Sequence, residues 1–181
     1  MADAKKISKK TFFEVKAPIT STKIFLYGTS KQELEGKIIS LDLTRSLRGK
    51  SIELKLKVKN ENDELTTEPI SLELVGSYIR KMIRAGTDYV EDSFIAECKE
   101  GKVIVKTFMI TRNKVSRAIR AELRNAARKS LEAHLRTRNL QEIFTEILTN
   151  KIQKELSLKL KKIYPLALCE IRFFKILVEK K

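Results

Sequence analysis

The chain has 181 residues, of which 42% are apolar, so it can bury a core and is not a wholly disordered polypeptide. Lys and Arg number 38 against 23 Asp and Glu, and the formal charge of +15 makes a polyanion, either nucleic acid or an anionic membrane surface, the expected partner. The two cysteines, Cys98 and Cys169, stand in apolar surroundings without metal-ligand spacing, which disfavours zinc and favours packing in the core.

The first ten residues are rich in lysine and contain no apolar segment of the kind that a secretory signal requires. We expect residues 1–10 to be a flexible basic arm that orders when it meets phosphate, and residues 11–181 to form a single domain. No run approaches the roughly 18 apolar residues of a membrane helix, so the expected location is the cytoplasm. The lysines of the arm are Lys5, Lys6, Lys9 and Lys10.

Short strands are predicted near the start of the chain, at residues 12–16, 24–27 and 37–43. Apolar and polar residues then alternate strictly over 51–59, which predicts a half-buried strand. The loop before this strand is basic and carries Arg45, Arg48 and Lys50.

A helix is predicted in the next segment, because Pro69 suits a first helical turn and the apolar residues up to Ile83 have helical spacing. Residues 60–67 are then expected to form a polar loop, and Gly86 is expected to stop the helix.

The second half predicts a hairpin followed by helices and a last strand. Glu100-Gly101 is a turn between β-rich residues 89–99 and 102–111. Apolar residues at helical spacing follow, and the chain closes with a β-prone run. The expected elements are helices over about 114–136, 140–148 and 152–163, and a strand over 168–178.

The expected helix over 114–136 carries arginines at i+3 and i+4, on one face. The first three have no Asp or Glu three or four residues away, and only the last has one, at Glu132. Unpaired arginines repel one another and bind phosphate well, so a phosphate-binding surface is favoured over a solvated face with internal ion pairs. This arginine row consists of Arg117, Arg120, Arg124 and Arg128, and Arg112 and Lys114 extend it.

Enzyme signatures are not met. Gly49-Lys50-Ser51 resembles the end of a P-loop, but Thr44 stands where a glycine is required. The single histidine, His134, has no nucleophile or metal-site pattern around it and is expected to be structural. We therefore predict no catalytic residue, no metal and no cofactor. A membrane-surface helix would need bulky apolar anchors, whereas this helix has small residues such as Ala118 and Ala126.

Several short segments occur in the order found in a known ribosomal family. They are Val15-Lys16-Ala17-Pro18, Gly28-Thr29, the Gly36-Lys37 strand entry, Ile79 to Ile83, Asp92, Arg117-Ala118-Ile119-Arg120 and Ile163-Tyr164-Pro165-Leu166. Over about residues 10–178 the chain resembles the S3Ae family, also called eS1, of archaeal and eukaryotic small ribosomal subunits. The longer tails of eukaryotic members are absent, so the chain is similar to the archaeal type. The resemblance implies an α+β fold in which an antiparallel, barrel-like sheet packs with several helices.

The resemblance also implies a structural constituent of the small ribosomal subunit rather than an enzyme, located on the cytoplasmic ribosome at the platform near the mRNA exit. Its implied partners are small-subunit rRNA, neighbouring small-subunit ribosomal proteins and mRNA near the exit site, with no membrane. From the residues themselves we expect the arginine row, the loop from Arg45 to Lys50 and the lysine arm to contact phosphates. The alternatives are a dissociable RNA-binding translation factor and a basic protein-interaction subunit.

Two pairs of adjacent aromatic residues are candidates for stacking on bases. Successive residues of a strand point to opposite faces, so one member of each pair is expected in the core and the other outside. The pairs are Phe12 with Phe13 and Phe173 with Phe174.

Overall fold

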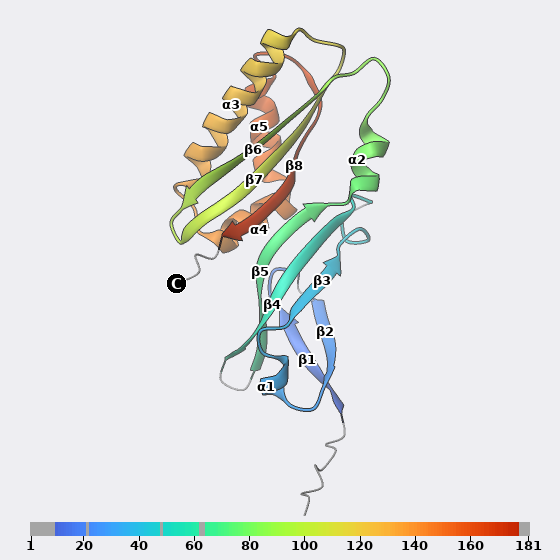
Figure 1. The fold of residues 1–181 in the computed structure, drawn as a ribbon, viewed down its shortest axis with the longest axis vertical. Coiled ribbons are helices and arrows are strands. Elements are labelled where there is room, and N and C mark those ends of the chain that lie inside the picture. The colour runs from blue at the N-terminus through green and yellow to red at the C-terminus, as the bar shows by residue number, and fades with distance from the viewer. Residues whose placement is uncertain (1–9, 21, 48, 62–63, 178–181) are drawn as a thin grey trace, which may run out of the picture.

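The computed structural model describes residues 10–20, 22–47, 49–61 and 64–177, and it shows an elongated α+β molecule (Figure 1). The N-terminal strands form its lower part and the C-terminal strands and three helices its upper part, with β5 running from one to the other. The α+β class expected from the sequence is confirmed. The sheet is open, so the barrel-like description fits only loosely.

The lower part is built from paired strands around a small core. Its elements are β1 (Thr11–Ala17), β2 (Thr22–Gly28), α1 (Lys31–Leu34), β3 (Ile38–Asp42), β4 (Ile52–Glu61) and β5 (Glu64–Leu74). β1 pairs antiparallel with β2 and meets β5 in parallel, while β4 lies between β3 and β5. Val15, Val58 and Leu65 are buried together with Leu34, which approaches Gly28 so closely that a β-carbon there would lie 2.9 Å from its side chain.

The segment around Pro69 differs from the prediction. Residues 64–74 form strand β5 instead of a loop and a helical start, and only Gly76–Met82 form a helix, α2. Pro69 is tolerated because the ladder with β4 is interrupted here: Lys55 pairs with Ser71 and Leu56 with Pro69, which leaves one residue of β5 bulged out.

The upper part consists of a three-stranded antiparallel region covered by helices on one face (Figure 1). Its elements are β6 (Tyr89–Cys98), β7 (Gly101–Thr111), α3 (Arg117–Leu135), α4 (Leu140–Leu148), α5 (Lys151–Leu160) and β8 (Leu166–Leu177). The predicted hairpin, helices and final strand are thus confirmed, with shifts of a few residues at their ends. The strand order along the main sheet is β2-β1-β5-β8-β7-β6, so β6 is an edge strand.

The main core lies between the helices and the β6-β7-β8 region. Helix α3 buries Leu123, Ala127 and Leu131, which follow one another at i+4 on the side that faces the sheet. Phe144 of α4 and Phe174 of β8 are fully buried and meet edge to face, with ring centroids 5.0 Å apart. These contacts fix α3 beside the edge strand β6, against which it packs.

A charged cluster ties the end of α3 to the two following helices. Nε2 of His134 lies 2.8 Å from Oε2 of Glu146, and the ammonium of Lys151 donates to Oε1 of the same carboxylate at 3.1 Å. Burial opposes ionisation of Glu146, but the hydrogen bonds from His134 and Lys151 outweigh it and hold the pKa of the carboxyl below its ordinary value. The expected structural role of His134 agrees with this position.

Candidate nucleic-acid interface

The turn that leads into α3 is held in place by hydrogen bonds to Asp88, just before β6, and to Thr111, at the end of β7. The backbone N–H of Val115 donates to Oδ2 of Asp88 at 2.9 Å, and the hydroxyl of Thr111 lies 2.7 Å from the carbonyl oxygen of Asn113. The hydroxyl of Ser116 then caps the first turn of the helix. Arg112 and Lys114 are exposed on this anchored turn, next to the first arginine of α3. The extension of the arginine row by Arg112 and Lys114 is therefore continuous with it.

The arginine row lies along α3, and its members differ in exposure. Arg117 and Arg124 are exposed, and neither forms an ion pair with an acid in the described part of the chain. Arg128 binds Glu132 at 2.9 Å, as its spacing predicted, and its guanidinium lies 5.5 Å from the ring centre of Phe94. The two exposed, unpaired arginines are the members best placed to bind an external anion.

Arg120 departs from the expectation of a uniformly exposed row. At about 100° per residue it projects from the same side of α3 as Leu123 and Ala127, and its Nε is buried without a hydrogen-bond partner in the described structure. Oδ2 of Asp92 and the hydroxyl of Thr107, on the paired strands β6 and β7, are buried and unpartnered too. The first turns of α3 therefore bury a polar atom of Arg120 beside Ile119, which packs against the main core.

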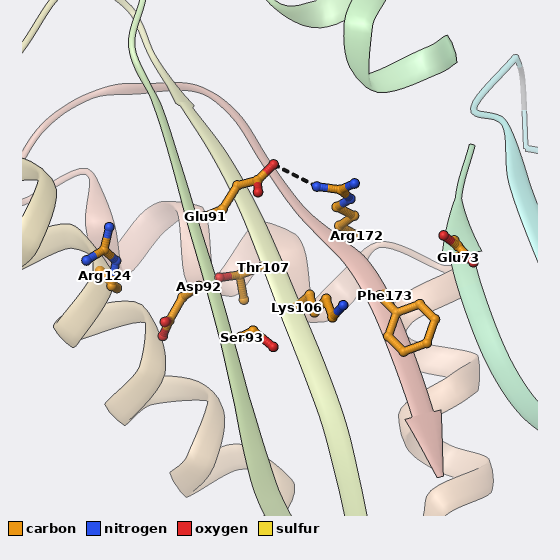
Figure 2. A pocket seen from close by; sticks show the side chains of 9 residues that line it. All are labelled: Glu73, Glu91, Asp92, Ser93, Lys106, Thr107, Arg124, Arg172 and Phe173. Carbon is orange, nitrogen blue, oxygen red and sulfur yellow. Dashed lines mark hydrogen bonds and ion pairs between the residues drawn. The ribbon is translucent and has the colours of Figure 1, made fainter. Parts of the chain in front are cut away.

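A hollow of about 430 Å³ lies next to the arginine row and extends over the strands (Figure 2). It brings Arg124 together with Lys106 of β7 and Arg172 of β8, whose guanidinium is bound to Glu91 at 2.9 Å. The ammonium of Lys106 lies 5.1 Å from the ring centre of Phe173. The further lining residues are Glu73, Asp92, Ser93 and Thr107.

Lys106 and Arg172 were not among the residues expected from the sequence to bind RNA. They come from different strands and approach Arg124 only because β6, β7 and β8 are neighbours in the sheet. A register shift between β7 and β8 leaves Arg172 without a direct partner in the ladder. The only local signal was that each is a cation within a β-prone, apolar run.

The basic loop before β4 contributes less to the surface than expected. Arg45 is exposed, but Lys50 is buried and its ammonium donates to Oδ1 of Asn150 at 2.6 Å and to the carboxylate of Glu170. Lys50 thus serves an intramolecular ion pair in place of the expected phosphate contact. Arg48 lies outside the described residues.

In the lysine arm, only Lys10 belongs to the described part of the chain. It is exposed, and its ammonium lies 5.8 Å from the ring centre of Tyr27. Lys5, Lys6 and Lys9 lie outside the described residues.

The described residues contain no group of three or more His, Cys, Asp or Glu side chains that could hold a metal ion. Cys98 and Cys169 are free thiols, and burial raises their pKa to about 11 and about 12. Thiols with such pKa values are poor nucleophiles at neutral pH. No helix in the part of the chain that the structure covers has the length and apolarity to cross a membrane.

These features define a basic α+β protein in which a helix edge and a neighbouring sheet offer exposed arginine and lysine side chains to an anion. The model of the Ribosomal S3Ae family matches residues 2–180, and the chain belongs to this family. The resemblance identified from the sequence, including its archaeal type, is thereby confirmed.

Named relatives include archaeal proteins called small ribosomal subunit protein eS1. The one from Methanothermobacter thermautotrophicus is 33% identical over 76% of this chain and 72% of its own length. The one from Nanoarchaeum equitans is 25% identical over 92% of this chain and 88% of its own. The one from Saccharolobus islandicus strain L.S.2.15 is 28% identical over 75% of this chain and 66% of its own.

Proposed function

We propose that this chain is a structural constituent of the small ribosomal subunit that binds rRNA at the platform near the mRNA exit. The match to the Ribosomal S3Ae family over residues 2–180 carries the ribosomal role. The further partners in this proposal are neighbouring small-subunit proteins and mRNA near the exit, and the location is the cytoplasmic ribosome.

The surface that we assign to rRNA begins with Arg112 and Lys114 and continues along α3 through Arg117 and Arg124. Their side chains are exposed, and no acid of the described structure is paired with them. Folded RNA is bound largely through phosphates, 2′-hydroxyls and shape, so this surface requires no base-specific pocket. The rigid attachment of α3 to the sheet keeps the cations in a fixed row and lowers the entropic cost of binding.

The remaining basic groups have separate parts in the proposal. Arg45, on the exposed loop, and Lys10, with the rest of the lysine arm, add phosphate contacts outside α3. Lys50 is left out because its charge is used within the fold. Arg120 and Arg128 support the row rather than bind directly, the first because it is half-buried and the second because Glu132 holds it.

Sedimentation of native lysate through sucrose separates this proposal from its main alternative, a dissociable RNA-binding translation factor. A structural constituent is expected to co-migrate with small subunits at low salt and after a high-salt wash. Release into the light fractions after the wash would favour the factor, and absence from the subunit fractions at low salt would contradict both.

The arginine row is tested with the double variant Arg117→Gln/Arg124→Gln. Removing two phosphate contacts is expected to weaken binding of a platform rRNA fragment and to lower the slope of log K against log salt by about 0.7 to 0.9 for each contact. The matched control, Lys154→Gln/Lys161→Gln, removes the same charge from exposed positions on and just after α5. Equal effects of the two variants on affinity and slope would show that the row has no special role.

A further inference from the structure

The β1–β2 hairpin exposes an aromatic face that the proposed rRNA surface on α3 does not use. Phe12 is 71%, Phe25 62% and Tyr27 56% exposed, and all three project from the same side of the hairpin. Phe12 and Tyr27 are paired across the strands, with ring centroids 5.1 Å apart. Phe25 lies two residues from Tyr27 on the same strand, about 7 Å along it.

This exposure follows from the alternation of the strands and is compatible with a well-formed core. Phe13 and Val15 of β1, and Ile24 and Leu26 of β2, point to the other side and pack in the small core with Leu34. The outer positions would be polar in an ordinary two-sided strand, because water faces them. Three large rings there indicate a surface that is covered in the working state of the protein.

The other side chains on this face are charged, and lysines predominate. Lys16 and Lys23 lie at its far end, bound to Glu64 and Glu14 at 2.9 Å, and Lys10 lies over Tyr27. The face has no exposed aliphatic side chain among its described residues. A docking site for an apolar protein surface would be expected to include aliphatic side chains, whereas rings beside lysines suit a ligand that is planar and anionic.

We propose that the outer face of the β1–β2 hairpin binds unpaired RNA, with bases stacked on Phe12, Phe25 and Tyr27 and a phosphate near Lys10, while Lys16 and Lys23 stay bound to Glu64 and Glu14. The proposal rests on the RNA-binding function inferred above and adds the class of RNA at a second site. Duplex RNA cannot use this face in the same way, because its bases are already stacked on one another.

The first test uses Tyr27→Trp in the full chain, which has no tryptophan of its own. An oligouridine of about 12 nucleotides, within the usual site size of such surfaces, is expected to quench the indole fluorescence as a base stacks on it. Inorganic polyphosphate supplies the charge without bases and should leave the fluorescence unchanged. Equal quenching by both would overturn the stacking proposal, since charge alone would then account for the signal.

The second test replaces all three rings by leucine, in Phe12→Leu/Phe25→Leu/Tyr27→Leu, which keeps the apolar character of the face. Affinity for oligouridine is expected to fall at least about tenfold, because stacking contributes roughly this factor or more for each base, while affinity for a duplex of equal charge stays the same. Tyr89→Leu is the matched control, since Tyr89 is a similarly exposed ring on β6. Circular dichroism and the melting temperature show whether each variant is folded.

The possible outcomes separate this proposal from the proposed function. If the triple variant binds oligouridine as tightly as the original chain while Arg117→Gln/Arg124→Gln weakens binding of the platform rRNA fragment, the hairpin proposal fails and RNA binding stands. If the original chain binds neither RNA, both fail. A concentration-dependent dimer that is abolished by the triple variant would show instead that the face pairs two copies of this chain.

Discussion

Lys50 offers the sharpest contrast between what its sequence context predicts and what the structure shows. In the sequence it belongs to a basic loop that is expected to meet phosphate, whereas in the structure its side chain is only 9% exposed and is paired with Glu170, which is 11% exposed. Removing one member of a buried pair leaves the other charge desolvated, at a cost of about 3–5 kcal/mol. Lys50→Met is therefore expected to destabilise the fold and to leave RNA affinity unchanged at temperatures where the variant is folded.

Thermal unfolding measures how much the Lys50→Met substitution destabilises the fold. For a chain of this length, each kcal/mol lowers the melting temperature by about 2–4 °C, so the expected decrease is about 6–20 °C. The double variant Lys50→Met/Glu170→Met should recover much of this loss, because an apolar pair of similar volume can replace a buried ion pair. An unchanged melting temperature combined with weaker RNA binding would refute the structural role and restore the phosphate contact.

Two further changes test the packing of the helices. Phe144→Ala is expected to lower the free energy of unfolding by about 3–5 kcal/mol, because it empties a fully buried site against Phe174. Urea unfolding measures this change. A loss below about 1 kcal/mol would contradict the packing described. The pKa of Glu146 is lower in the folded chain than its ordinary value of 4.5, so ionised Glu146 stabilises the fold. This stabilisation is fully present when the pH is above 4.5 and is lost as the pH falls through the folded-state pKa. Glu146→Gln should therefore be less stable at pH 7 and show a shallower decline in melting temperature below pH 4.5, whereas a decline as steep as that of the original chain would be inconsistent with this linkage.

The C-terminal elements could be predicted from the sequence because their signals are local and agree with one another. The tight turn between the two β-prone runs is Lys99-Glu100, one residue earlier than predicted, with Gly101 opening β7, and Asn139 with Glu142 forms the capping box of α4. The helices there keep a period of 3.6, and the strands are rich enough in apolar and β-branched residues to be recognised although bulges interrupt the pairing of β7 with β8. Propensity, turn chemistry and pattern all indicated the same structure, and tertiary contacts did not override them.

The segment from Glu64 to Leu74 could not be predicted because a bulge breaks its period. Leu65 and Thr67 are buried at a spacing of two, but beyond Pro69 the extra residue shifts the pattern so that Leu72 and Leu74 are buried instead. The apolar residues therefore fall at irregular intervals that resemble helical spacing. The bulge itself depends on pairing with β4, which a local pattern does not contain.

The same distinction explains which parts of the candidate site were predictable. The arginine row follows from helical spacing alone, so its existence could be inferred, but the partial burial of Arg120 depends on where the sheet meets α3. For the hairpin, strand alternation predicts that Phe12 points outward, while its position opposite Tyr27 depends on the register of β1 and β2. Cations on a helix can thus be assigned to a surface from sequence. Rings and cations contributed by a sheet become a site only through strand order and register, which is why the aromatic face emerged from the structure.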